Sequence, residues 1–268
     1  MHPVVLWHPR VTGYGAMLAL AWLVGWWLAR RRAVHVGISR WHIDWLMPLL
    51  VLGMLAGSRC AGRLCQLLSP NSSNDRVLLG AIVAAVAVVV LYAALARLPL
   101  GRIADAFGFS LPAGIAVLRV GCLLAGCCWG ERCSSGWPIG MTYPAGSPAY
   151  DHHQMAGLLP AHAERSLPVH PVPLYEAGAM LGLLGVLILL DRRGLPSGES
   201  FLAFGLGYCL LRFPLEWFRA DNISLVCGLT VAQVASFCGA GVCAAVWFAR
   251  RRLSAKRTNV TATGVLLR

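Results

Sequence analysis

Five arginines and two glutamates lie within or beside long apolar stretches of this sequence, where charged side chains are rare: Arg59, Arg63, Arg119, Glu176, Arg212, Glu216 and Arg219. A charge at the centre of a membrane span costs about 2.5–3.5 kcal/mol, so such residues face a cavity or one another. Arg212, Glu216 and Arg219 are spaced by four and then three residues, which places them on one face of a helix. Because the arginines outnumber the carboxylates, the pattern predicts one basic cavity.

Guanidinium groups bind phosphate oxygens through paired hydrogen bonds, so the expected ligand of this cavity is the headgroup of an anionic phospholipid. The alternative is structural. The same residues would then form ion pairs between helices, or would extend their arginine side chains toward the membrane surface.

Composition predicts that membrane-spanning helices carry these residues. Hydrophobic residues make up 57% of the 268 residues and charged residues 13%, against about a quarter charged in soluble domains. The mean hydropathy is +0.65. We therefore expect an all-α, polytopic membrane protein of about seven helices, each close to the roughly 20 residues that span a bilayer. The expected helices cover residues 11–30, 44–63, 77–96, 103–124, 173–190, 201–218 and 226–249.

The distribution of basic residues predicts the orientation. Most of the 23 lysines and arginines fall in segments that are cytoplasmic if the N-terminus lies outside, so we expect the N-terminus outside and the C-terminus in the cytoplasm. The expected domains are a transmembrane domain over 1–249, with an outer loop at 125–172, and a cytoplasmic tail over 250–268. This asymmetry explains the net charge of +12 without a nucleic-acid partner. The expected location is a bacterial inner membrane, with the cavity facing the periplasm.

The loop at 125–172 holds four of the eight histidines: His152, His153, His162 and His170. Long loops are usually either functional or disordered. The tryptophans, tyrosines and prolines of this one favour an ordered cap, built as a helix in the membrane plane or as an extended lid. Each histidine is expected to pack or to face solvent, and any of them is a candidate general base.

Four of the ten cysteines fall close together, at 122, 127, 128 and 133. Zinc-binding thiolates usually come in pairs separated by a few residues. The spacing here differs, so we expect neither a metal nor a cofactor. A disulfide between Cys133 and Cys127 or Cys128 is one alternative. The favoured interpretation is that these cysteines are small residues packed where a helix ends.

Several motifs follow one another along residues 11–245. They include His-Pro-Val-Pro-Leu-Tyr-Glu-Ala at 170–177 and Tyr-Cys-Leu-Leu-Arg-Phe-Pro-Leu-Glu-Trp-Phe-Arg at 208–219. A further motif is Leu-Arg-Val-Gly at 118–121, which is followed by Gly126 and Gly130. The remaining motifs are Tyr-Gly at 14–15, Ala-Gly-Ser-Arg at 56–59 and Gly-Leu-Thr-Val-Ala-Gln at 228–233. In these motifs the chain resembles the prolipoprotein diacylglyceryl transferase family.

The resemblance implies a seven-helix enzyme of the inner membrane. Members of this family move the diacylglyceryl unit of phosphatidylglycerol onto the lipobox cysteine thiol of a preprolipoprotein, which forms a thioether and releases glycerol 1-phosphate. By position, the catalytic residues would be Arg119, Arg212, Glu216, Tyr14 and Tyr208, with the two arginines on the phosphate. The substrate-binding residues would be Arg59, Gly121, Cys122, Gly126, Cys127, Gly130, His170, Tyr175, Glu176 and Arg219.

The chain departs from the family pattern at three places. Cys122 stands where the family has asparagine, and Cys127 where it has glutamate. Asp75, Arg76 and Val77 replace the family's His-Gly-Gly, and a carboxylate beside an arginine is a poor base. Two alternatives to group transfer therefore stay open. One is a non-catalytic protein of the same fold that binds anionic phospholipid, and the other is a membrane thiol-redox or metal protein.

Overall fold

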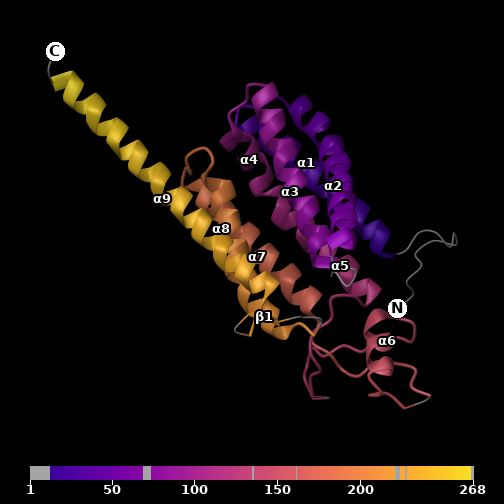
Figure 1. Cartoon of the computed structure of the whole chain (residues 1–268). Coiled ribbons are helices and arrows are strands. Elements are labelled where there is room, and N and C mark those ends of the chain that lie inside the picture. The colour runs from indigo at the N-terminus through magenta and orange to yellow at the C-terminus, as the bar shows by residue number, and fades with distance from the viewer. Residues whose placement is uncertain are drawn as a thin grey trace. The chain divides into compact units, whose positions relative to one another are not determined.

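The computed structural model describes residues 13–68, 74–134, 136–160, 162–220, 224–226 and 228–266, and this part of the chain is mostly helical (Figure 1). Its helices are α1 (Gly13–His35), α2 (Arg40–Leu68), α3 (Asn74–Leu95), α4 (Leu100–Gly108), α5 (Ser110–Ala125), α6 (Pro148–Met155), α7 (Val172–Arg192), α8 (Glu199–Leu215) and α9 (Val231–Leu266). The other elements are the short 3-10 helix η1 (Glu216–Phe218) and the strands β1 (Ser224–Val226) and β2 (Leu229–Thr230).

Each of the seven predicted apolar segments contains helix, which confirms an all-α, multi-pass membrane protein. Within the described residues, six spans are long and apolar enough to cross a membrane: 40–64, 78–95, 100–125, 172–192, 199–218 and 231–252. The helix α1 is not among them, because three tryptophans and a run of three arginines lower its hydropathy. The predicted orientation stays a prediction.

One predicted helix, 103–124, is divided at Phe109 into α4 and α5. Pro112 lies in the first turn of α5, and in a continuous helix its ring would clash with the carbonyl of Gly108. The hydroxyl of Ser110 donates a hydrogen bond to the Phe107 carbonyl at 3.2 Å across the junction. The proline therefore explains the break.

The last predicted helix, 226–249, is displaced toward the C-terminus. The strands β1 and β2 pair antiparallel, with Ser224 opposite Thr230, and Gly228 adopts a φ of +76° at the turn. This hairpin delays the start of α9 to Val231. The helix then continues to Leu266, because the basic residues that end the apolar run are themselves good helix formers. The predicted boundary at residue 249, between the transmembrane domain and the cytoplasmic tail, coincides with the end of the apolar run. That this position is a domain boundary stays a prediction.

The chain forms two compact units, which are described separately. The first, called the large unit, comprises described residues of 13–24, 111–195 and 202–266; the second, called the small unit, comprises those of 25–110 and 196–201. In the small unit, α2 and α3 pack closely through Gly57 and Gly80, where an added Cβ would clash with the other helix. Small residues at such positions let helix backbones approach each other in a membrane.

In the large unit, α7, α8 and α9 lie side by side (Figure 1). An added Cβ at Gly207 of α8 would clash with Leu183 of α7, and one at Gly205 would lie 2.9 Å from the Cys243 sulfur of α9. The helix α8 therefore packs between its two neighbours. Its close contacts bring the C-terminal end of α8 beside the N-terminal ends of α7 and α9.

The described residues of the loop between α5 and α7 form both helix and extended segments, and the predicted position of this loop as a cap at the membrane plane stays a prediction. It has the short helix α6, whose N-terminus is capped by the Ser147 hydroxyl, and extended segments joined by isolated bridges such as Met141 with Val169. Tyr143, Ala149 and Val169 form its small buried core.

Candidate active site

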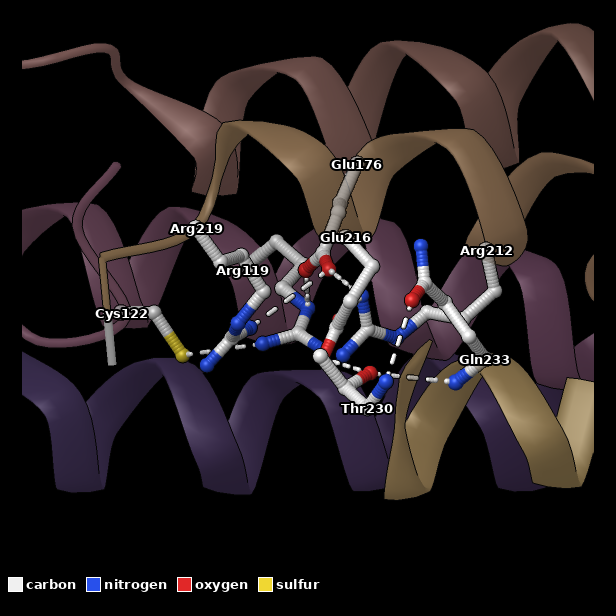
Figure 2. A network of polar contacts seen from close by, with 8 residues as sticks. All are labelled: Arg119, Cys122, Glu176, Arg212, Glu216, Arg219, Thr230 and Gln233. Atoms are coloured by element: carbon white, nitrogen blue, oxygen red, sulfur yellow. Dashed lines mark hydrogen bonds and ion pairs between the residues drawn. The ribbon is translucent and has the colours of Figure 1, made fainter. Parts of the chain in front are cut away.

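Five charged residues from α5, α7, α8 and η1 converge in the large unit (Figure 2). Arg119 lies toward the end of α5, and Glu176 near the start of α7. Arg212 lies in the last turn of α8, after which the chain tightens into η1, where Glu216 is the first residue and Arg219 the C-cap. The predicted i, i+4 and i+7 spacing therefore directs all three of these last side chains to one place.

Glu176 is the centre of this cluster. One carboxylate oxygen pairs with Nε of Arg119, and the other lies 3.6 Å from Nη1 of Arg212 and 3.7 Å from Nη1 of Arg219. The Glu176 side chain is only 5% exposed. A buried carboxylate needs partners to offset its lost hydration, and three guanidiniums supply them.

Glu216 is the second carboxylate, with a side chain 4% exposed. One of its oxygens pairs with Nη1 of Arg212, and the other accepts a hydrogen bond from the Thr230 hydroxyl at 2.9 Å. Arg212 thus contacts both carboxylates. This double contact fixes the guanidinium between α7 and η1.

Thr230 and Gln233 complete the cluster from the hairpin and α9, and the sequence analysis gave them no role. The Gln233 N–H donates to the Thr230 hydroxyl at 3.2 Å, and the Thr230 N–H donates to Gln233 Oε1 at 3.1 Å. This reciprocal pair is a capping box, whose Thr-x-x-Gln signature was available in the sequence. The amide nitrogen Nε2 of Gln233 is buried without a hydrogen-bond partner among the described residues.

A small pocket opens against the cluster. It is lined by Arg119, Glu176, Tyr208 and Arg212 together with the apolar residues Ile115, Met180 and Leu215. Three guanidiniums face two carboxylates, so the cluster carries one net positive charge. The ion pairs of the structural alternative are present, and the pocket beside them has both polar and apolar walls.

The two predicted tyrosines lie near Arg119. Tyr208 lines the pocket. Tyr14, in the first turn of α1, lies close to Gly121 of α5, where an added Cβ would lie 3.5 Å from the tyrosine ring and 2.9 Å from the Met17 Cβ. Gly121 therefore permits the close approach of α1 to α5 that brings Tyr14 to this side of the cluster.

Two glycines shape the loop beside the cluster. Gly126 ends α5 with a φ of +65°, and an added Cβ there would lie 2.9 Å from the Tyr143 ring. Gly130 forms a bridge with Arg219 and donates its N–H to the His170 carbonyl at 2.9 Å. An added Cβ at Gly130 would lie 2.7 Å from the His170 Cβ. Gly130 thus holds the Arg219 backbone in place, whether or not either glycine contacts a lipid.

His170 and Tyr175 belong to an aromatic group. The His170 Nδ1 lies 3.2 Å from the Tyr175 hydroxyl, which also accepts a hydrogen bond from the Trp137 indole at 3.4 Å. The His170 ring makes edge contacts with the rings of Trp137 and Phe218. These contacts position the turn before α7, and they leave the substrate-binding role of both residues as a prediction.

The loop also contains buried groups with displaced pKa values. Burial, reinforced by His152 and Arg132, lowers the pKa of His153. Burial raises the pKa of Tyr143 to about 12. His153 is a core residue of α6, in agreement with the packing role expected for it.

Cys122, Cys127 and Cys128 gather where α5 ends, with their sulfur atoms within 4.8 Å of one another. The guanidinium Nη1 of Arg119 lies 3.9 Å from the Cys122 sulfur, as Figure 2 shows. Hydrogen bonds from Cys122 and Cys127, with smaller contributions from Arg219 and Arg119, lower the pKa of Cys128. Cys133 is a free thiol outside this group.

For three other predicted residues, the structure does not test a place in this cluster. Arg59 and Arg63 are exposed residues of α2 in the small unit, so their share in one cavity stays a prediction. Asp75 lies in α3, and its side chain falls outside the described residues. Its expected weakness as a base also stays a prediction.

Comparison with known proteins agrees with the motifs. The sequence profile of the prolipoprotein diacylglyceryl transferase family matches residues 3–250. A phosphatidylglycerol–prolipoprotein diacylglyceryl transferase of Nitratidesulfovibrio vulgaris strain DP4 is 28% identical over 227 residues, which cover 79% of this chain and 78% of that protein. The protein of the same name from Erwinia tasmaniensis is 29% identical over 266 residues, covering 89% and 88%. The one from Klebsiella pneumoniae strain 342 is 29% identical over 269 residues, covering 89% of each chain.

Proposed function

This chain belongs to the prolipoprotein diacylglyceryl transferase family, and we propose that it moves the diacylglyceryl unit of phosphatidylglycerol to a cysteine thiol of a prolipoprotein. The observation that carries the proposal is the arginine–glutamate cluster with one net positive charge beside a pocket that is partly apolar. A phosphodiester carries one negative charge and is attached to an apolar body. Charge and polarity therefore both match this lipid class.

The arginines are proposed to bind the phosphate. Arg119 and Arg212 both line the pocket, and each is held by a buried carboxylate that restricts its side chain. A guanidinium fixed in this way presents paired donors to phosphate oxygens at little further entropic cost. Arg219, whose Nη1 lies 3.7 Å from the same Glu176 oxygen that Arg212 approaches, is proposed to add a third positive charge to the phosphate site.

The apolar wall of the pocket is proposed to receive the glyceryl part of the lipid. Ile115, Met180 and Leu215 form this wall, and Tyr208 lies at its polar boundary. The buried amide nitrogen of Gln233 is assigned to a hydroxyl group of the headgroup, because it is a donor without a hydrogen-bond partner among the described residues. In this proposal, the phosphate lies at the arginines and the glyceryl carbon lies next to it.

The reaction replaces a carbon–oxygen bond with a carbon–sulfur bond. The thiolate of the lipobox cysteine attacks the carbon of the diacylglyceryl unit that is bonded to the phosphate oxygen. The carbon–oxygen bond breaks, and its electron pair leaves with glycerol 1-phosphate. Cationic groups fixed around the leaving phosphate stabilise the charge that develops on it. Arg119 and Arg212 are proposed to do this.

The incoming thiol must lose its proton, because the thiolate is the nucleophile. Positive charge within a few ångströms lowers the pKa of a thiol. The excess charge of the arginine cluster is therefore proposed to raise the fraction of thiolate in the bound peptide. The proton then passes to solvent or to a base close to the pocket.

The proposed location rests on the same family membership. We propose that the protein resides in a bacterial inner membrane, with its N-terminus and the arginine cluster toward the periplasm and its C-terminus in the cytoplasm. Support comes from the excess of arginine and lysine in the segments assigned to the cytoplasm. The proposed partners are phosphatidylglycerol and the lipobox segment of a prolipoprotein.

Complementation of a bacterial strain depleted of its own transferase tests the proposal. The parent protein should restore growth and mature lipoproteins, whereas Arg119→Lys and Arg212→Lys should not, because a lysine lacks the paired donors of arginine. Arg192→Lys is the matched control, since Arg192 ends α7 about 24 Å along the helix from Glu176. Failure of the parent protein to restore lipoproteins, combined with binding of phosphatidylglycerol vesicles, would favour the non-catalytic alternative.

A further inference from the structure

We propose that the thiols of Cys122, Cys127 and Cys128 form a three-coordinate binding site for copper(I). Nothing in the transferase reaction needs this site, and the proposal does not depend on that reaction. The motifs of the family resemblance do not require cysteine at positions 122, 127 and 128 either. The support for the site is the geometry of the three thiols.

The three sulfur atoms lie within 4.8 Å of one another. Metal–thiolate bonds are about 2.3 Å long, so three sulfurs around one ion lie about 4 Å apart. Small rotations of the side chains would bring the three sulfurs to that separation. Among the described residues, this is the one group of three or more potential ligands that meets such a distance limit.

The backbone is built to bring these thiols together. The helix α5 ends at Ala125, and Gly126 adopts a φ of +65° that reverses the chain. Cys128 has a φ of +56°, in the left-handed region that residues other than glycine rarely adopt. Strain of this kind is concentrated at functional sites. The turn directs Cys127 and Cys128 back toward Cys122 on the last turn of the helix.

The ligand set favours copper(I) over zinc. Thiolates select soft ions, and structural zinc almost always takes four protein ligands, whereas the group here contains three. Cys122 is buried and the other two thiols are half-buried, which restricts access by water as a fourth ligand.

Two arginines of the cluster lie close enough to act on the thiols. Arg119 Nη1 lies 3.9 Å from the Cys122 sulfur, and Arg219 interacts electrostatically with Cys128. Positive charge nearby favours the thiolate form that binds a metal ion.

The test is a copper(I) titration of the full-length protein in detergent micelles, under anaerobic reducing conditions and in competition with a chromogenic copper(I) chelator. The parent protein should bind one copper(I) ion. Cys122→Ser and Cys127→Ser should each lower the copper(I) affinity by about 100-fold or more, because loss even of a residue that only hydrogen-bonds to a metal ligand lowers metal affinity 10–100-fold. Cys133→Ser should keep the parent affinity, because Cys133 lies in the same loop but outside the group.

A third variant, Cys128→Gly, guards against misfolding, because glycine adopts a positive φ without strain. The thermal midpoint of Cys128→Gly should equal or exceed that of the parent protein. Its copper(I) affinity should fall as far as that of Cys122→Ser and Cys127→Ser. Copper X-ray absorption of the loaded parent protein should show three sulfur neighbours. Parent-like affinity in Cys122→Ser, displacement of copper(I) by equimolar zinc, or a copper site without sulfur neighbours would each overturn the proposal.

Discussion

Replacing Arg212 with glutamine, alone and together with Glu216→Gln, separates the two roles that this arginine can have. Arg212 pairs with both buried carboxylates of the cluster, and it also lines the pocket. If the role of Arg212 is only to neutralise Glu216, the double variant should recover both the stability and the lipid affinity of the parent protein. If Arg212 binds phosphate, the double variant should recover the stability alone.

The expected magnitudes follow from burial. The Glu216 side chain is 4% exposed, and removing one partner of a buried ion pair costs about 3–5 kcal/mol. The Glu216→Gln change should recover most of this loss, because neutral replacement of a buried pair is often tolerated and the amide oxygen of the introduced side chain can still accept a hydrogen bond from Thr230. A lost hydrogen bond to a charged group costs about 1.5–3 kcal/mol, so affinity for the lipid should fall roughly 10- to 150-fold in both variants.

Thermal unfolding in micelles and binding of phosphatidylglycerol vesicles measure the two effects separately. The single variant should lose both stability and lipid affinity, whereas the double variant should regain the thermal midpoint and remain weak in binding. Arg192→Gln, at the opposite end of α7 from Glu176, controls for loss of an arginine in general. Parent-like lipid affinity in the double variant would refute the assignment of Arg212 to phosphate.

Three further predictions concern topology, backbone and pH. Cysteines introduced at the exposed positions Ser134 and Ser197 should be labelled from opposite sides of the membrane, above the labelling of the parent; labelling from one side only would contradict the proposed orientation. Gly126→Ala should lower the free energy of unfolding by about 1–2 kcal/mol, because alanine is strained at a φ of +65°; an unchanged thermal midpoint would contradict this. The pKa of His153 is lowered in the folded protein, so the unfolded state binds the proton more readily. Stability should therefore be lost as the pH falls below the unfolded value of about 6.5, and His153→Phe should reduce this loss of thermal midpoint; an equal loss in the variant would show that other groups cause it.

The charged cluster could be predicted because charged residues are costly in membrane spans. Their positions in apolar segments, and the i, i+4 and i+7 spacing from Arg212 to Arg219, predicted convergence, and the structure brings together five of the seven residues in one unit. The sequence could not define the pairing within the cluster. That depends on which helices are neighbours, and here the close packing of α7, α8 and α9 decides it.

Other features were hidden by the apolar pattern itself. The run at 226–249 reads as one continuous span, which concealed the hairpin and the capping box of Thr230 and Gln233. The span at 103–124 concealed the break before Pro112. The three thiols approach one another through the positive φ angles of Gly126 and Cys128, which the spacing of the cysteines does not reveal.

The most direct test of the central claim is a transfer assay with the purified protein in nanodiscs that contain phosphatidylglycerol. A synthetic lipobox peptide should gain the mass of one diacylglyceryl group on its cysteine, and an equal amount of glycerol 1-phosphate should be released. A peptide with serine in place of that cysteine, and nanodiscs of phosphatidylethanolamine alone, should give no product. If the parent protein binds phosphatidylglycerol but forms no thioether at any pH through the thiol range, the claim that it is a transferase is contradicted.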